Sequence, residues 1–319
     1  MLHAFTLKNG YLRRVNVEAA ADLRSEPLVW VDMVGATPEE AAWVESTYHL
    51  QLPRPEHLRD LEASARFFEH EGALNLRSDF LSGTESQSHS VAVAFVLTGE
   101  TLISVHDVDI PIFRLLRLRL HAESGSIGDS RDVLVDLYGM DVESSADALE
   151  EVYADLGRVG QRVLGSTLDD RQAGFALAEI AGAEYVNGRI RRNVMDTQRG
   201  LSYLIRSKTL SAAQIEEVRQ IQQDIESLDG HTAFLFDKIN FLMATTVGFI
   251  NINQNRIVRL FSVVAVALLP PTLIASIYGM NFRHLPELDW ALGYPFALLL
   301  MALSVAIPFW YFHRRGWLK

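Results

Sequence analysis

The sequence contains no cysteine among its 319 residues. Disulfide bonds and thiolate sites for zinc, copper or iron–sulfur clusters are therefore excluded. Proline is absent between Pro111 and Pro270, so no proline interrupts a helix in that stretch. Basic residues are outnumbered, with 29 Lys and Arg against 40 Asp and Glu, which gives a formal net charge of −11. Because nucleic-acid binding needs clustered positive charge, this balance argues against a nucleic-acid partner and favours a body that attracts cations.

Charge is also missing from two long apolar runs near the C-terminus. The first covers Leu260 to Tyr278 and the second covers Ala291 to Phe312. As a helix, each run of about 20 residues is long enough to cross ~30 Å of hydrocarbon. We therefore expect a two-span membrane hairpin behind a large soluble body.

Basic residues flank this hairpin at the two ends where the chain enters and leaves it. Arg256 and Arg259 precede the first run, and Arg314, Arg315 and Lys319 follow the second. The connecting loop has one basic residue against two acidic ones. The positive-inside rule then predicts both termini in the cytoplasm. The N-terminus has no signal-peptide pattern, which favours the same orientation.

Residues 1 to ~110 alternate short apolar runs with turn residues, a pattern typical of a mixed α/β layer with a β-meander. Asn9-Gly10 predicts a hairpin within residues 5–17. Thr37-Pro-Glu-Glu40 predicts a capping box opening a helix that ends near Tyr48. A further helix is expected over residues 56–61, and further strands over residues 28–34, 73–81, 91–97 and 101–106.

The proline-free region that follows is predicted to be helical almost throughout. Helices are expected over residues 112–122, 130–164 and 175–207, with turn residues between them. A last helix begins at the capping box Ser211-Ala-Ala-Gln214. Its apolar stripe predicts packing against neighbouring helices and comprises Ile215, Val218, Ile221, Ile225, Leu228, Leu235, Ile239 and Leu242. If this helix continues to Tyr278, it spans about 100 Å at 1.5 Å per residue and needs partner helices, most simply from copies of itself.

The first apolar run carries small and polar residues at alternating steps of three and four, which we call the polar seam. Its members are Asn255, Val258, Ser262, Ala265, Leu269, Thr272, Ser276 and Gly279. Such a mixture does not suit a lipid-facing surface, and the second run has no counterpart. The first span is therefore expected to be inner and the second outer. Several inner spans around an axis would line a passage, although the same spacing also suits tight helix packing.

A double proline lies in the middle of the first run, at Pro270-Pro271. It frees backbone carbonyls, which must face protein or water within a membrane. A lined passage satisfies that need, and a simple helix kink is the alternative reading.

At the end of the first run, Tyr278-Gly-Met-Asn281 resembles the CorA family of magnesium channels, which carry Gly-Met-Asn after the first of two C-terminal spans. Pro270-Pro-Thr-Leu273, Leu285-Pro-Glu-Leu288 and Gly293-Tyr-Pro295 are similar to that family's membrane region. The segments 60–69 and Met195-Asp-Thr-Gln-Arg199 are similar to its cytoplasmic domain, so the resemblance covers essentially the whole chain. Tyr138-Gly-Met-Asp141 nearly repeats the tripeptide by chance.

The resemblance implies an α+β membrane protein that assembles as a funnel-shaped homopentamer. The implied division is an α/β cytoplasmic domain over residues 1–110, a helical and stalk region over 111–255, and an inner pore-lining span over 256–281. A periplasmic loop over 282–291, an outer span over 292–312 and a basic cytoplasmic tail over 313–319 complete it. The implied location is the bacterial inner membrane.

The resemblance also assigns residues to a pore. Gly279, Met280 and Asn281 would form the selectivity filter. The pore lining and gate would comprise Asn255, Val258, Phe261, Leu269, Thr272 and Ser276. Phe261 occupies the family's hydrophobic constriction, whereas the polar seam places Ser262 there; we favour Phe261, because an aromatic ring of side chains can close a pore by dewetting.

Two features of the family are altered or less readily placed in this sequence. Arg283 stands where the family often has an acidic residue, so Glu287 and Asp289 must supply the negative charge of the loop. The family's regulatory magnesium sites use aspartates between subunits, and Asp224 is the candidate here, with solvated helix surface as the alternative reading.

The expected function is Mg²⁺ uptake down its electrochemical gradient, gated by intracellular Mg²⁺. No cofactor is expected beyond Mg²⁺ as the transported and regulatory ion, and the expected partners are Mg²⁺, lipid and further copies of the chain. Co²⁺ and Ni²⁺ are further candidate ions. The alternatives are a Zn²⁺, Co²⁺ or Ni²⁺ transporter of the same superfamily and a membrane-tethered regulatory domain. The sequence has no phosphate loop, His-Glu-x-x-His or serine elbow, so we do not expect an enzyme.

Overall fold

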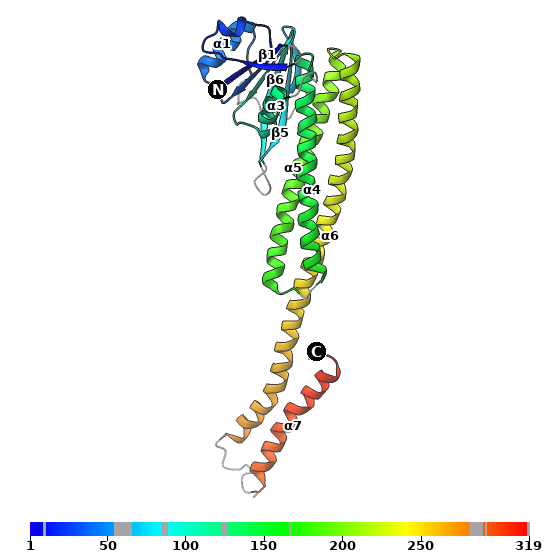
Figure 1. The fold of residues 1–319 in the computed structure, drawn as a ribbon. Helices are drawn as coiled ribbons and strands as arrows, with labels where there is room; N and C mark the ends of the chain where they lie inside the picture. Colours follow the sequence, from blue (N-terminus) through cyan, green and yellow to red (C-terminus); the bar gives the residue numbers. More distant parts are fainter. Residues whose placement is uncertain are drawn as a thin grey trace. The chain divides into compact units, whose positions relative to one another are not determined.

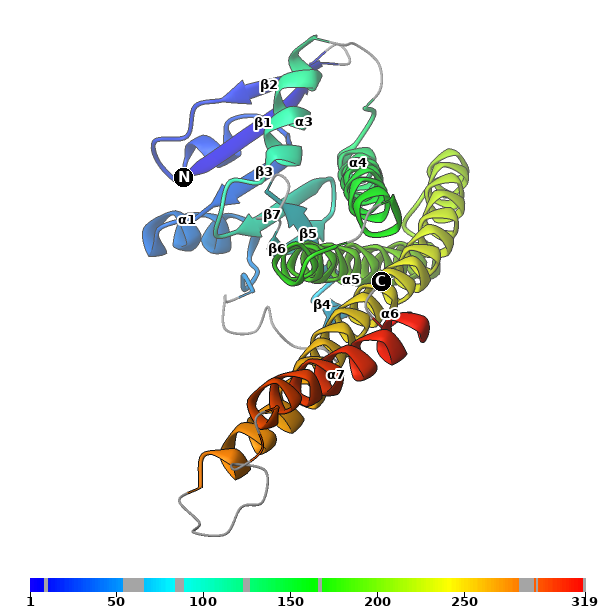
Figure 2. The same ribbon diagram turned by 90° about the horizontal axis from the view of Figure 1, so that it is seen from below.

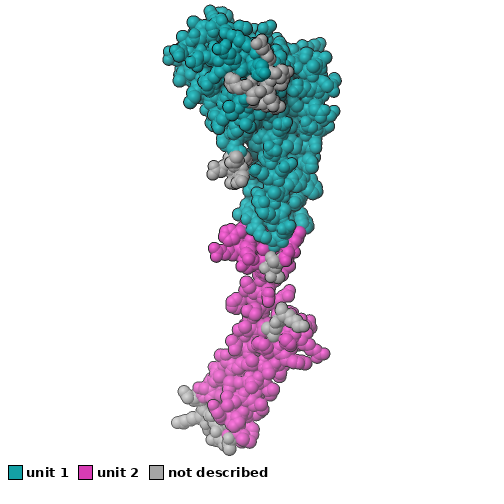
Figure 3. Space-filling model, viewed as in Figure 1, with its two compact units in different colours: residues 1–162, 178–242 teal, residues 163–177, 243–319 magenta. Residues whose placement is uncertain are grey.

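The computed structural model describes residues 1–8, 11–53, 66–83, 89–122, 127–165, 168–280, 290 and 292–317. The chain divides into two compact units, coloured separately in Figure 3. Unit 1 comprises Met1–Arg162 and Ala178–Leu242, and unit 2 comprises Val163–Leu177 and Met243–Lys319. The predicted helix over residues 56–61 lies outside the described residues.

Unit 1 contains a mixed sheet whose described strands lie in the order β2-β1-β3-β7-β6-β5-β4. The strands are β1 (Leu2–Lys8), β2 (Tyr11–Val15), β3 (Leu28–Val34), β4 (Phe67–His70), β5 (Ala73–Ser82), β6 (His89–Thr98) and β7 (Thr101–His106). Neighbouring strands pair antiparallel except β3 and β7, which pair in parallel. Lys8 pairs with Tyr11 across Asn9-Gly10, which confirms the predicted hairpin. Strand β4 was not predicted; it has four residues, pairs with β5 and lies at the edge of the sheet formed by the described strands.

Helices cover both faces of the sheet (Figures 1 and 2). On one face, α1 (Pro38–Tyr48) packs through Val44 onto a core that includes Val31, Met33 and Ile103. The predicted capping box at Thr37 is confirmed, since its hydroxyl accepts from the Glu40 amide while the Glu40 carboxylate accepts from the Thr37 amide.

The opposite face carries an aromatic core. Phe80 of β5 and Phe95 of β6 contact Phe113 of α3 (Pro111–Ala122) and Tyr138 of α4 (Ser130–Gly165). All four rings are fully buried. Rings of this size bury large apolar areas, so this layer fixes the sheet to the first part of the helical region.

Three long helices follow, and their order agrees with the predicted helical region. They are α4, α5 (Asp170–Ser207) and α6 (Ala212–Tyr278), and α6 contributes residues to both units. The predicted start of the second helix at Phe175 is wrong. Asp169 and Gln172 bond each other's backbone amides through their side chains, so the capped helix begins at Asp170.

The capping box at Ser211 and Gln214 is confirmed, and α6 runs on through Gly230 without a break. Every member of its predicted apolar stripe except the half-buried Ile215 is buried. Asn187 of α5 donates to the Thr232 carbonyl of α6 at 3.0 Å, which fixes the register of the two helices within unit 1.

Candidate functional site

Two helices in the described part of the chain are long and apolar enough to cross a membrane, α6 and α7 (Gly293–Arg314). In their most apolar 18-residue windows, mean hydropathy is 2.2 and 1.9, yet only 11% and 6% of each window is buried. A core helix of a soluble protein with this hydropathy would be covered by protein. The bare apolar surface therefore agrees with two membrane spans.

One face of α6 packs on α7 within unit 2, where the two helices lie side by side (Figures 1 and 2). On this face Val263 and Ala267 are buried and Ile274 is half-buried. On α7 the facing stripe begins with the buried residues Gly293 and Ala297. Small residues at these positions let two membrane helices approach closely.

The polar seam lies on the other side of α6. At 3.6 residues per turn, its centre is rotated by about 160° from the face that packs on α7. Every member of the seam is exposed, and so is Phe261, at 69%. The chain thus covers one side of α6 in this stretch and leaves the rest of its surface uncovered, including the side that carries Asn, Ser, Thr and Gly.

Phe261 and Ser262 both lie on this uncovered side. Each is about 50° from the centre of the seam, in opposite directions around the helix. A passage between α6 helices of several copies could therefore be lined by either residue after a small rotation of the helices. Phe261 stays our predicted constriction.

Two hydroxyls of the seam bond to the backbone of their own helix. Ser262 donates to the Val258 carbonyl at 2.8 Å, and Thr272 donates to the Leu268 carbonyl at 2.7 Å. A hydroxyl that donates a hydrogen bond to a carbonyl keeps its oxygen lone pairs free to accept a hydrogen bond from another group. These oxygens can therefore accept hydrogen bonds from the water shell of a cation.

The helix ends at the glycine of the predicted filter. Gly279 donates to the Ala275 carbonyl at 2.9 Å, and Met280 donates to the Ile277 carbonyl at 3.2 Å. A Cβ at position 279 would lie 3.1 Å from the Ala275 carbonyl oxygen, tighter than ordinary packing, which favours glycine there. Asn281, Glu287 and Asp289 lie outside the described residues.

The predicted regulatory residue Asp224 lies in unit 1, on an exposed face of α6. No group of three or more His, Asp or Glu side chains in the described ranges is arranged to hold a metal ion. The role of Asp224 as a ligand of a regulatory ion stays a prediction.

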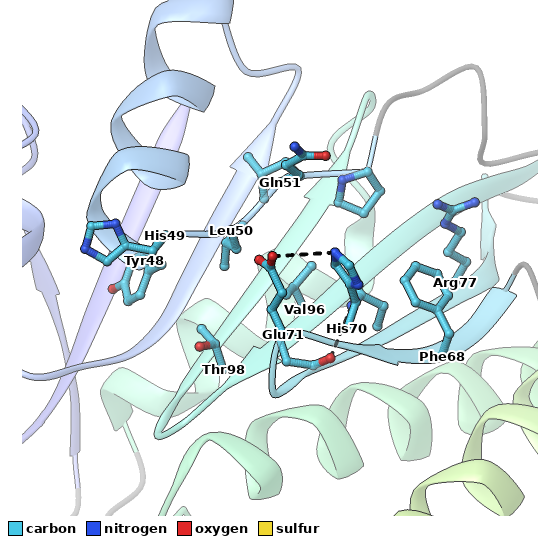
Figure 4. Close-up of a pocket in the computed structure, with 14 residues that line it drawn as sticks. Tyr48, His49, Leu50, Gln51, Phe68, His70, Glu71, Arg77, Val96 and Thr98 are labelled. Carbon is cyan, nitrogen blue, oxygen red and sulfur yellow. Dashed lines mark hydrogen bonds and ion pairs between the residues drawn. The ribbon is translucent and has the colours of Figure 1, made fainter.

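A pocket of about 370 Å³ lies on the α1 side of the sheet (Figure 4). Figure 4 shows His70 and Glu71 at the β4–β5 turn, facing Gln51 from the segment after α1. The His70 and Glu71 side chains are about two-thirds exposed and 3.9 Å apart. Two solvated side chains at this distance make a weak ion pair and no metal site.

The two segments that resemble the family's N-terminal domain contact each other through one residue of each, which the sequence did not predict. Arg66 of the first segment forms a buried ion pair with Asp196 of the second at 2.7 Å. The Asp196 carboxylate also accepts from the Asp79 amide of β5 at 2.9 Å. These residues therefore tie α5 to the edge of the sheet, a structural role.

Asp141 is a second buried carboxylate nearby, and it has only neutral donors. It accepts from the Leu81 amide at 3.2 Å, the Asn193 amide at 2.9 Å and the Thr197 hydroxyl at 3.0 Å. Burial raises the pKa of Asp141 to about 7, against the three hydrogen bonds, which lower it. The chance copy of the tripeptide, Tyr138 to Asp141, thus lies inside α4 and joins α4, α5 and β5.

The described geometry joins an α/β unit, a long helix and two bare apolar helices. A sequence model described as "CorA-like Mg2+ transporter protein" matches residues 25–314. The chain belongs to the CorA family. The magnesium transport protein CorA of Escherichia coli K12 is 41% identical over 322 residues, covering 100% of both chains. The magnesium transport protein CorA of Salmonella typhimurium LT2 is 40% identical over 319 residues, again covering 100% of both.

A solved structure of another CorA protein has the same fold. The complete CorA magnesium transporter of Methanocaldococcus jannaschii matches with a TM-score of 0.80 at 18% identity, covering 99% of this chain and 98% of that one. The predicted CorA fold is therefore confirmed, with its N-terminal α/β domain, long helix and two apolar helices. The bacterial CorA relatives are named as transport proteins, not as enzymes.

Proposed function

We propose that this chain forms a homopentameric channel that admits Mg²⁺ across the bacterial inner membrane, with both termini in the cytoplasm. The observation that carries this proposal is the 41% identity, over the full length, to a protein named for magnesium transport. Identity at this level along the whole chain includes both the soluble unit and the two apolar helices.

The uncovered polar seam supports the same function. Asn255 would be costly against lipid, because no acyl chain can pair with its side-chain amide, and the free lone pairs of the Thr272 and Ser276 oxygens would find no donor there. Copies of α6 that turn this face toward a common axis would give these groups water and ions as partners. α7 would then form the outer layer, consistent with its exposed Leu298, Leu299 and Trp310.

The proposed filter suits a hydrated cation. Mg²⁺ is small and sheds its water reluctantly, so a site that strips it costs much energy and a ring of carboxylates holds it too long. A ring of Asn281 amide oxygens with Gly279 carbonyls would instead accept hydrogen bonds from the water shell. Selection then follows from size and dipole, while an inside-negative potential contributes ~2.3 kcal/mol per charge per 100 mV.

Gating by intracellular Mg²⁺ is part of the proposal. With 40 acidic against 29 basic residues, neighbouring copies repel one another unless cations screen them. Bound Mg²⁺, with Asp224 as the candidate ligand, would hold the copies together and close the Phe261 ring. Depletion of internal Mg²⁺ would let the copies separate and the ring widen.

Flux into liposomes tests the proposal. Purified protein reconstituted with an internal Mg²⁺ indicator should carry Mg²⁺, and a parallel Zn²⁺ measurement separates it from a zinc transporter. Asn281→Ala should abolish flux with assembly intact, whereas Asn16→Ala, the same change at an exposed site of unit 1, should not. Absence of Mg²⁺ flux from the unmodified protein, or normal flux from Asn281→Ala, would contradict the assignment.

A further inference from the structure

The turn between α4 and α5 is fastened to α6 by one side chain within unit 2. The Asn253 amide nitrogen donates to the Leu168 carbonyl at 2.8 Å and to an Asp170 carboxylate oxygen at 3.3 Å. Both partners are acceptors, so the orientation of the Asn253 amide follows from the chemistry. Leu168 is buried and Asp170 is the first residue of α5, so the anchor joins α6 to a packed residue and to the start of a helix.

Among the described residues, the anchor is the last point at which the turn between α4 and α5 holds α6 before the first apolar run. Asn253 is half-buried, and residues 254–262 are all exposed. The next covered residue is Val263, which is 1% exposed where α6 packs on α7. A bare stretch of α6 therefore lies between two fixed points, and it carries Asn255, Val258 and Phe261.

A helix held at two points has a fixed rotation about its own axis. Side chains lie about 5–6 Å from the axis, so a turn of about 20° moves a side chain by roughly 2 Å. A constriction made of one side chain from each copy changes width directly with that rotation. The rotation of α6 at the start of the span thus decides how Phe261 meets its counterparts.

We propose that Asn253 is a positioning residue that sets the rotation of α6 and so couples the α4–α5 turn to the Phe261 constriction. This role rests on the channel function proposed above, because it concerns the closing of that channel. Asn253 does not line the path itself: it lies about 130° around the helix from the centre of the polar seam. Loss of the anchor frees the bare stretch to rotate and makes closure less complete.

The test replaces the donor without changing side-chain size. Asn253→Asp places a carboxylate against the Leu168 carbonyl and the Asp170 carboxylate, which repel it. Asn16→Asp is the matched control, since it makes the same charge change at an exposed residue of unit 1, away from the polar seam. The double variant Asn253→Asp with Asp170→Asn reverses the pair and restores one hydrogen bond.

Two measurements on the full chain in liposomes are needed. The first is the dependence of the flux on internal Mg²⁺. It gives the maximal flux without internal Mg²⁺ and the internal Mg²⁺ concentration at which the flux falls to half of that maximum. We expect Asn253→Asp to raise that concentration roughly three- to tenfold, the range expected for one lost hydrogen bond, with maximal flux unchanged. Asn16→Asp should stay at the unmodified value, and the double variant should return part of the way.

The second measurement is hydrogen–deuterium exchange of amides 168–173, which does not depend on transport. Exchange should be faster in Asn253→Asp and normal in Asn16→Asp. Unchanged exchange in Asn253→Asp would show that the anchor is absent. Faster exchange without a change in the internal Mg²⁺ concentration that halves the flux would show that the anchor stabilises the turn but does not position the constriction. Absence of flux from the unmodified chain would instead refute the channel, and the positioning role with it.

Discussion

Gly200 lies where α5 passes over the buried aromatic layer, and its replacement tests that packing. A Cβ at this position would lie 2.8 Å from the Tyr138 hydroxyl oxygen and 3.2 Å from the adjacent ring carbon. Tyr138 is fully buried, and its hydroxyl is 2.8 Å from the Ser78 hydroxyl. The ring therefore has no free space into which it can move.

The expected cost of Gly200→Ala can be worked from these contacts. Overpacking of a core costs about 1–3 kcal/mol, and displacing the buried hydroxyl pair adds about 1–2 kcal/mol. Replacing glycine inside a helix returns up to ~1 kcal/mol. We expect a net loss of about 2 kcal/mol in the free energy of unfolding.

The control is Gly188→Ala on the same helix, where an added Cβ has nothing within 4 Å. That variant should gain up to ~1 kcal/mol from helix propensity alone. The free energy of unfolding of both variants can be measured by chemical denaturation of the detergent-solubilised chain, with hydrogen-exchange protection of α5 amides as the readout. Adding Tyr138→Phe to Gly200→Ala removes the clashing oxygen and should cost less than the sum of the single variants. Equal stability of Gly200→Ala and Gly188→Ala would refute the packing described.

Three other predictions concern titration, conduction and closure. The Asp141 pKa is raised from 3.8 to about 7, so between these pH values the folded state holds a proton that the unfolded state has lost. The free energy of unfolding should therefore fall by up to ~4 kcal/mol as the pH rises from about 4 to 7. Asp141→Asn should remove this pH dependence in unfolding experiments. Thr272→Val should lower Mg²⁺ flux about three- to tenfold by removing the outward oxygen, whereas Ser304→Ala on α7 should not. Phe261→Ala should leave flux open at internal Mg²⁺ levels that close the unmodified channel, and Leu298→Ala on α7 should close normally.

Local signals in the sequence predicted much of the fold. Asn9-Gly10 and the boxes opened by Thr37 and Ser211 each involve residues within four positions of one another, so their chemistry is visible in the sequence. The predicted start of α5 at Phe175 is wrong because an equivalent box at Asp169 and Gln172 opens the helix five residues earlier. Its signal, an acidic residue three positions before Gln172, was of the same kind as the boxes that were recognised.

Contacts between distant segments could not be predicted in this way. The parallel pairing of β3 with β7 joins strands about 70 residues apart, and the intervening β-meander gives no local indication of it. The Arg66–Asp196 ion pair and the Asn253 anchor likewise join residues far apart along the chain. Their residue types are ordinary on a helix surface, and only the fold makes them partners.

The candidate site is intermediate between these cases. The three–four spacing of the polar seam predicted one shared face of α6, and the structure leaves that face uncovered opposite α7. The order of inner and outer spans followed from the same spacing. The roles of Gly279, Met280 and Asn281 came from the family resemblance, because a tripeptide alone has no periodicity.

Water access to the polar seam tests the central claim most directly. The chain has no cysteine, so Thr272→Cys and Ser276→Cys each introduce a single thiol, with Leu298→Cys on α7 as the control. A water-soluble, membrane-impermeant thiol reagent should modify both seam positions in reconstituted protein and block Mg²⁺ flux, while the α7 thiol stays unmodified. Seam thiols that react only with a lipid-soluble reagent would place this face against acyl chains and contradict a water-filled path along α6.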